Sequence, residues 1–181
     1  MTNTRVLLLP GWLDSGPGHW QTRWEQLHGW QRVQQHDWVW PRRGDWMAQL
    51  ETTLLASPQP AVLVAHSLGC HLVAAWAAHS AHTDRVRGAL LVAPPDVDAP
   101  DLPPQLAPWR PARRHRLPFA ARLLYSSDDP FGSVACAEAL ATDWGAEARC
   151  IGPRGHLNAE SGLGDWPEGA AEVQRLLGLS R

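Results

Sequence analysis

The sequence predicts a compact three-layer α/β domain in which helices cover both faces of a mostly parallel sheet. Short apolar runs of strand length alternate with longer segments of helical periodicity. Two of the runs, residues 61–65 and 88–93, are wholly apolar, as expected for central parallel strands that are buried on both faces. The chain has 181 residues and no linker that would split it, so we expect one domain over residues 1–181.

The first predicted strand is residues 5–10, a short apolar run that ends in Pro-Gly. Residues 19–28 favour a helix because apolar side chains recur at i, i+4 and i+7, as Trp20, Trp24 and Leu27. A weaker pattern predicts a strand over residues 33–38. Asp45 is expected to cap the next helix, which stops before Pro58 and has one apolar face formed by Met47, Leu50 and Leu54.

The remaining two thirds of the chain repeat the same alternation. Strands are predicted at residues 61–65, 88–93, 120–125 and 146–151. Helices are predicted at residues 68–81, 133–144 and 168–177.

Residues 94–118 interrupt this pattern, because they hold eight of the sixteen prolines of the chain. Proline at this density excludes a long helix or a paired strand, so the segment is predicted to be an irregular loop between two strands. Such loops leave the carboxyl ends of parallel strands, where ligands bind. We therefore expect Trp109 to line a substrate pocket. The alternative for the segment is a plain surface connection. The alternative for Trp109 is that it only anchors the loop to the core.

The overall composition argues against several classes of protein. All 16 basic residues are arginine and face 18 acidic residues, and the net charge of -2 argues against nucleic acid as the main partner. No apolar run approaches the roughly 18–20 residues that span a membrane. The N-terminus has no recognisable secretory signal, so we expect a cytoplasmic protein.

The most informative motif is the pentapeptide Ala-His-Ser-Leu-Gly at residues 65–69. It lies between a predicted strand and a predicted helix, which is the setting of a nucleophile elbow. The sharp turn exposes the hydroxyl of Ser67 and requires small residues two positions before and after, which Ala65 and Gly69 provide. Ser67 is therefore the candidate nucleophile, and the alternative is a serine that only caps the helix.

A serine nucleophile needs a histidine base and a carboxylate that orients it. In this setting they follow in the order Ser, Asp, His, each after a strand. Asp128 and Asp129 follow the strand that ends at Tyr125, and His156 follows the next strand. The residues alone do not separate the two carboxylates, and turn formation or a surface histidine would explain each of them singly.

An oxyanion hole would complete the site with two backbone N–H groups. One is expected from Leu68, directly after the nucleophile at the helix N-terminus. The other is expected from Trp12, because Gly11 before it allows the backbone to approach closely.

The stretches Leu-Leu-Leu-Pro-Gly-Trp at residues 7–12 and Val-Ala-His-Ser-Leu-Gly-Cys at 64–70 resemble the small serine hydrolases grouped with retinoblastoma-binding protein 9 and YdeN. Ser-Asp-Asp-Pro-Phe at 127–131 and Gly-His at 155–156 extend the resemblance. It implies a compact α/β-hydrolase fold without a large cap domain. It also implies that Asp129, directly before Pro130, is the orienting carboxylate. Pro10 departs from the family, in which many members have His there.

Other clusters give weaker signals. His71, His79 and His82 lack further residues at metal-ligand spacing, so no metal is expected. The arginine-rich residues 110–116 favour a solvated loop over a nucleic-acid surface. No glycine-rich phosphate loop precedes a helix, so no nucleotide or other organic cofactor is expected.

These observations predict a serine hydrolase that cleaves a small acyl ester or thioester through an acyl-enzyme. The sequence does not separate esters, thioesters and peptide bonds, and it leaves protein partners unspecified. The alternative is a protein-interaction module that retains the fold and the three residues. A covalent probe of reactive serines would separate the two.

Overall fold

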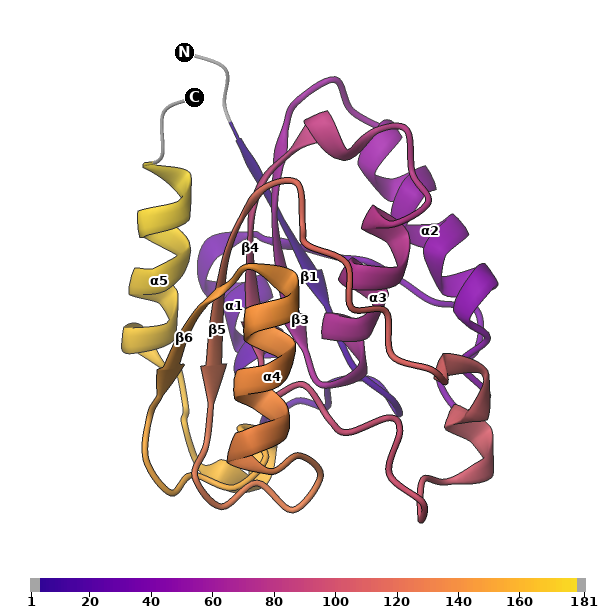
Figure 1. Ribbon diagram of the computed structural model, residues 1–181. Coiled ribbons are helices and arrows are strands. Elements are labelled where there is room, and N and C mark those ends of the chain that lie inside the picture. Colours follow the sequence, from indigo (N-terminus) through magenta and orange to yellow (C-terminus); the bar gives the residue numbers. More distant parts are fainter. Residues whose placement is uncertain (1–3, 179–181) are drawn as a thin grey trace.

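The computed structural model describes residues 4–178, which form a six-stranded, wholly parallel sheet (Figure 1). The strand order is β2-β1-β3-β4-β5-β6. The strands are β1 (Arg5–Leu9), β2 (Gln31–Arg32), β3 (Ala61–His66), β4 (Val86–Val92), β5 (Ala120–Tyr125) and β6 (Glu147–Cys150). The predicted α/β fold class with a parallel sheet is confirmed.

Helices cover both faces of the sheet and complete the three layers (Figure 1). One face packs against α1 (Trp20–His28) and α5 (Pro167–Leu177). The other packs against α2 (Arg43–Leu55), α3 (Leu68–Ala77) and α4 (Val134–Trp144). Short 3₁₀ helices lie at Thr83–Arg85, Pro104–Trp109 and Ala159–Ser161.

Two hydrophobic cores follow directly from the alternation of side chains along the strands. Leu7 and Leu63 point to the α2, α3 and α4 side, whereas Leu8 and Val62 point to the α1 and α5 side. All six residues of β3 are buried, because this strand lies in the middle of the sheet with helices over both faces.

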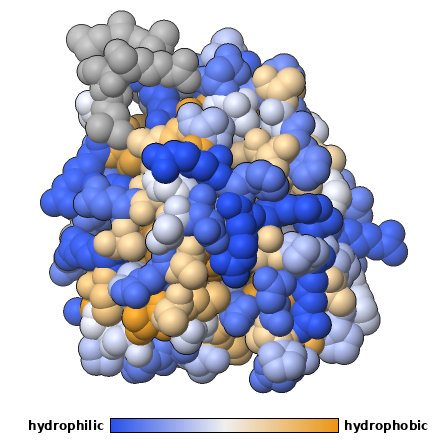
Figure 2. Space-filling model, in the orientation of Figure 1, coloured by the Kyte–Doolittle hydropathy of each residue, from blue (hydrophilic) through white to orange (hydrophobic). Residues whose placement is uncertain are grey.

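The surface in the view of Figure 2 is polar in most places, with small apolar areas between the polar ones. This distribution fits helices that turn one side to the sheet and the other to water. Within residues 4–178, no helix is long and apolar enough to cross a membrane.

Three predictions of local structure are wrong. The strand expected at residues 33–38 is instead the two-residue β2, and after Val33 the carboxylate of Asp37 accepts the N–H groups of Val39 and Trp40 in a turn. Asp45 does not cap α2 but lies in its first turn, where a negative charge still favours the helix. The helix expected to reach residue 81 ends at Ala77.

The proline-rich segment 94–118 is irregular, as predicted, apart from the 3₁₀ helix at Pro104–Trp109. It leaves the carboxyl end of β4 and returns to β5. Its far end is fixed to α4, because the Leu117 N–H donates to the Trp144 carbonyl (3.0 Å). The strands point with their carboxyl ends to the lower edge in Figure 1, and the candidate site lies at this edge.

Candidate active site

Ser67 occupies a strained turn between β3 and α3. Its φ of 54° lies in the left-handed region, which costs energy for a residue with a side chain. The turn is held because the Ser67 N–H donates to the Val92 carbonyl (2.9 Å). A Cβ on Gly69 would lie 2.3 Å from the Leu9 carbonyl oxygen, so glycine is required there. The predicted elbow geometry is therefore present.

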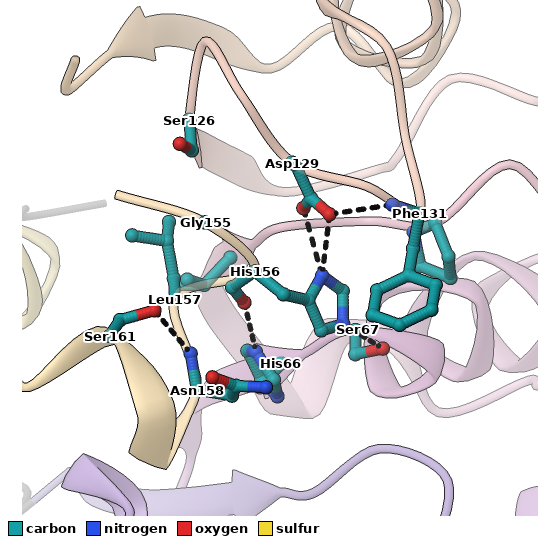
Figure 3. Close-up of polar contacts among 12 residues, drawn as sticks. His66, Ser67, Ser126, Asp129, Phe131, Gly155, His156, Leu157, Asn158 and Ser161 are labelled. Atoms are coloured by element: carbon teal, nitrogen blue, oxygen red, sulfur yellow. Dashed lines mark hydrogen bonds and ion pairs between the residues drawn. The ribbon is translucent and has the colours of Figure 1, made fainter. Parts of the chain in front are cut away.

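Ser67, His156 and Asp129 form one chain of hydrogen bonds (Figure 3). The Oγ of Ser67 lies 2.8 Å from Nε2 of His156. The Nδ1 of the same ring lies 2.8 and 3.0 Å from the two carboxylate oxygens of Asp129. Because a carboxylate only accepts, the ring carries its proton on Nδ1, and Nε2 is free to accept the serine proton. The arrangement can activate Ser67 as a nucleophile.

The two neighbouring aspartates have different contacts. Asp128 does not bond the imidazole, and its carboxylate accepts from Ser126 Oγ (2.6 Å) and from the Gly155 N–H (2.8 Å). These bonds lower the pKa of Asp128, and the bond from Ser126 has the larger effect. Asp129 faces His156 with only 4% of its side chain exposed. The structure thus brings Asp129 to the histidine and uses Asp128 to hold the loop before it.

The backbone N–H groups of Trp12 and Leu68 have no backbone acceptor among residues 4–178. Their loops are in contact, because a Cβ on Gly11 would lie 2.8 Å from Ser67 Cβ and 3.2 Å from the Leu68 nitrogen. The Trp12 indole donates to the Val39 carbonyl (2.9 Å), which fixes the loop. The role of these two N–H groups in an oxyanion hole stays a prediction.

Comparison with known proteins decides the family. The family model described as serine hydrolase matches residues 6–175. The chain belongs to the serine hydrolase family. Membership makes the protein a hydrolase, and the sequence resemblance to YdeN-like hydrolases is confirmed. None of the curated protein sequences compared with this hydrolase matches it.

Solved structures share the fold. A YdeN-like hydrolase from Pectobacterium atrosepticum is 27% identical, with a TM-score of 0.85 over 96% of this chain and 90% of that one. The YdeN protein of Bacillus subtilis is 19% identical, with a TM-score of 0.76 over 98% of this chain and 100% of that one. The esterase RhEst1 from Rhodococcus is 14% identical, with a TM-score of 0.68 over 98% and 92%. The last two show likeness of fold alone.

Sequence reasoning missed two residues that shape this edge of the hydrolase. Arg32 is nearly buried, pairs with Asp14 (2.6 Å) and donates to the Ser15 carbonyl (3.0 Å), so it fixes the loop that contains Trp12. Phe131 packs its ring edge-on against His156 at 4.7 Å between ring centroids. Phe131 lay within a motif of the family resemblance, whereas no local pattern marks the long-range contacts of Arg32.

The histidine cluster and the arginine-rich segment make contacts within the fold. Within residues 4–178, no group of three or more His, Cys, Asp or Glu side chains is arranged to hold a metal. The ring of His79 donates to the Ala75 carbonyl (2.9 Å). In the arginine-rich segment, Arg110 donates to the Val97 carbonyl (2.9 Å) and Arg114 pairs with Asp143 (2.7 Å). The contacts of these two arginines hold the arginine-rich segment in place.

Trp109 is not brought to the site. Its side chain is in the core with 2% exposed, its indole donates to the Pro41 carbonyl (2.7 Å), and its ring lies edge-on to Trp46 at 5.6 Å. This position favours the alternative, in which Trp109 anchors the proline-rich loop to the core, over the predicted pocket wall.

Replacing Trp109 by Ala is expected to lower the free energy of unfolding by about 3–5 kcal/mol, because a large buried side chain and its hydrogen bond are lost. Urea denaturation measures the change, and selectivity between acyl chains is expected to stay the same. Trp40→Ala is the matched control for the stability measurement alone, since the Trp40 side chain is 55% exposed. If Trp109→Ala changed the selectivity between acyl chains without changing the free energy of unfolding, Trp109 would be assigned to the pocket wall after all.

The burial of His71 and His19 is expected to make the hydrolase sensitive to acid. The ring of His71 is buried on α3, with Nε2 donating to the Pro95 carbonyl (2.8 Å) and Nδ1 without a partner among the described residues. Burial outweighs that bond and lowers the pKa of His71 to about 4, and burial lowers the pKa of His19 to about 3. In the unfolded chain both histidines take up a proton below about pH 6.5.

Lowering the pH is therefore expected to destabilise the fold already at pH values well above those at which carboxylates take up protons. A lowered histidine pKa gives stability that is complete above about pH 6.5 and is lost as the pH falls towards the folded-state values. At pH 5 each of the two histidines costs about 2 kcal/mol, which urea denaturation at pH 7.5 and pH 5 measures. His71→Phe is expected to flatten this dependence, and equal stability of the parent protein at both pH values would contradict it.

Proposed function

We propose that this hydrolase is one catalytic domain that cleaves small acyl esters or thioesters through Ser67, His156 and Asp129. The observation that supports this most directly is the unbroken chain of hydrogen bonds from the Ser67 hydroxyl to the Asp129 carboxylate at a strained elbow. A serine that only capped a helix would not need a histidine 2.8 Å from its oxygen.

The reaction would start when Ser67 attacks the acyl carbonyl and passes its proton to Nε2 of His156. Asp129 holds the ring in the required tautomer and stabilises the cation that forms. The N–H groups of Trp12 and Leu68 would donate to the oxyanion. His156 then protonates the leaving alcohol or thiol, and a water molecule activated by the same histidine releases the acid. Side chains and backbone groups supply every step, so the proposal includes no cofactor.

Exposed apolar side chains on loops at the carboxyl ends of the strands support an acyl substrate. Residues 4–178 expose six large apolar side chains, and four of them belong to loops at this edge of the sheet: Leu13, Val39, Trp40 and Phe131. The loop of Leu13 and the loop of Val39 are joined, because the Leu13 N–H donates to the Trp38 carbonyl (3.1 Å). Exposed apolar side chains on loops beside a candidate site are suited to binding an acyl chain, and this is the role that we propose for them.

The test is covalent labelling by a fluorophosphonate probe, followed by a series of p-nitrophenyl esters and acyl thioesters of graded chain length. We expect labelling of the native protein and turnover of short acyl chains. Native protein that is neither labelled nor active on any of them would overturn the proposal and favour an interaction module that keeps the fold. Turnover of peptides alone would overturn the substrate class while leaving the nucleophile in place.

A further inference from the structure

Two buried histidines lie behind the candidate site and take no part in the proposed chemistry. His66 precedes the nucleophile on β3, and His19 caps the N-terminus of α1. Only 4% of His19 and 5% of His66 is exposed. Their rings are in contact, with centroids 4.6 Å apart, and the His66 ring also lies 5.0 Å from that of His156. We call His19 and His66 the histidine pair.

The contacts of the histidine pair fix where each ring carries its proton. The main-chain oxygen of His156 can only accept, so His66 donates to it from Nε2 (2.9 Å; Figure 3). At the other end, Nδ1 of His19 accepts the Gln21 N–H (3.1 Å). The remaining contact joins His19 Nε2 to His66 Nδ1 at 3.3 Å, and it is satisfied when His19 donates. One neutral tautomer of each ring therefore completes every bond.

A proton added to either ring would break this pattern. His66 protonated on Nδ1 would turn an N–H towards the N–H of His19, and His19 protonated on Nδ1 would face the N–H of Gln21. Burial also keeps the rings neutral, because it lowers the pKa of His19 to about 3 and that of His66 well below its ordinary value. The pair thus places no positive charge beside His156, which becomes a cation when it takes the serine proton.

The first residue of α1 donates a hydrogen bond to a second main-chain carbonyl in the loop that contains His156. The Trp20 indole donates to the main-chain oxygen of Leu157 (2.8 Å), directly after the oxygen that His66 holds. Leu157 has a φ of 52°, so its backbone is strained and needs support from its surroundings. Two consecutive carbonyls are therefore held from α1, one by Trp20 directly and one through the histidine pair.

We propose that His66, oriented by His19, is a positioning residue that fixes the main chain of His156 so that its ring stays within reach of Ser67. The inference rests on the proposed function and adds to it a residue that does not touch the substrate. A hydrogen bond to a backbone oxygen is well suited to this task, since it sets the position of the loop without adding charge.

Two replacements of His66 separate positioning from packing. His66→Phe keeps an aromatic ring at this position but loses the N–H donor, and we expect kcat to fall about tenfold or more with KM nearly unchanged. His66→Gln keeps a terminal N–H₂ that reaches the same carbonyl, and we expect it to recover most of the lost kcat. His79→Phe, at an exposed histidine two residues beyond the end of α3, is the matched control and should match the parent protein. Melting temperatures are measured alongside.

A kcat of His66→Phe equal to the parent value would overturn the inference, as would a His66→Gln variant no better than His66→Phe at equal stability. Loss of labelling in the native protein would instead overturn the proposed function itself. His19→Asn keeps a capping oxygen for Gln21 and removes the contact to His66, so a reduced kcat with α1 intact supports the pair acting together.

The tautomers can be observed without activity. Long-range ¹H–¹⁵N spectra of the native protein are expected to show His66 and His19 as neutral rings protonated on Nε2 from pH 5 to pH 8. Titration of either ring in this range, or a proton on Nδ1 of His66, would overturn the inference even where the variants lose activity.

Discussion

Ser67→Ala is expected to abolish fluorophosphonate labelling and to reduce ester turnover by at least about a thousandfold, because the attacking oxygen is removed. The melting temperature should change little. Alanine inherits the strained φ of 54° that serine already has, and Ser67 and His156 are partly exposed, so water can replace the lost partner of His156. Labelling, p-nitrophenyl ester kinetics and thermal unfolding measure the three expectations.

Ser127→Ala is the matched control, since Ser127 is an exposed serine in the loop between β5 and α4, near the histidine. This variant should label and turn over like the parent protein. Activity retained in Ser67→Ala and lost in Ser127→Ala would show that the nucleophile is assigned to the wrong serine. Loss in both variants together with a lower melting temperature would point to damage to the loops rather than to chemistry.

The sequence predicted the elements that have a strong local pattern. The strand at residues 120–125 matches β5, and the helix beginning at Ser133 matches α4, with Ser133 as its cap. The edge strand β2 was misplaced because it has only two residues, Gln31 and Arg32, which are too few to show an alternation. In α2, the contacts of the fold select Trp46 rather than Met47 for burial, although both fit a helical face.

The residues of the candidate site that could be predicted are those marked by the local sequence around them. Ser67 is marked by its own turn, and His156 by its place after a strand. The choice of Asp129 over Asp128 needed the family resemblance, because two adjacent carboxylates before a proline have the same local pattern. The bond of His66 to the His156 carbonyl spans 90 residues, and Trp109 reaches Pro41 across 68. Such contacts depend on the assembled layers and leave no trace in local periodicity.

Asp129→Asn is the second variant with a large expected effect. The amide keeps the shape of the side chain but loses the charge that stabilises the imidazolium during the reaction. Its N–H₂ group can also donate to Nδ1 of His156, which moves the ring proton to Nε2 and leaves no acceptor for the proton of Ser67. We expect kcat to fall by about a thousandfold or more, since loss of the correct tautomer alone costs about 10⁴ in a well-studied serine protease, a different protein.

Asp128→Asn is the matched control, because it makes the same chemical change one residue away. An amide oxygen at position 128 can still accept from Ser126 and from the Gly155 N–H, so we expect kcat to fall less than about tenfold. The two charge-assisted bonds become weaker, and the cost should therefore fall on the melting temperature. The reverse ranking of the two variants in ester kinetics would assign the orienting carboxylate to Asp128. Equal and small losses would show that neither aspartate orients His156 and that the bonds at 2.8 and 3.0 Å serve only to hold the loop.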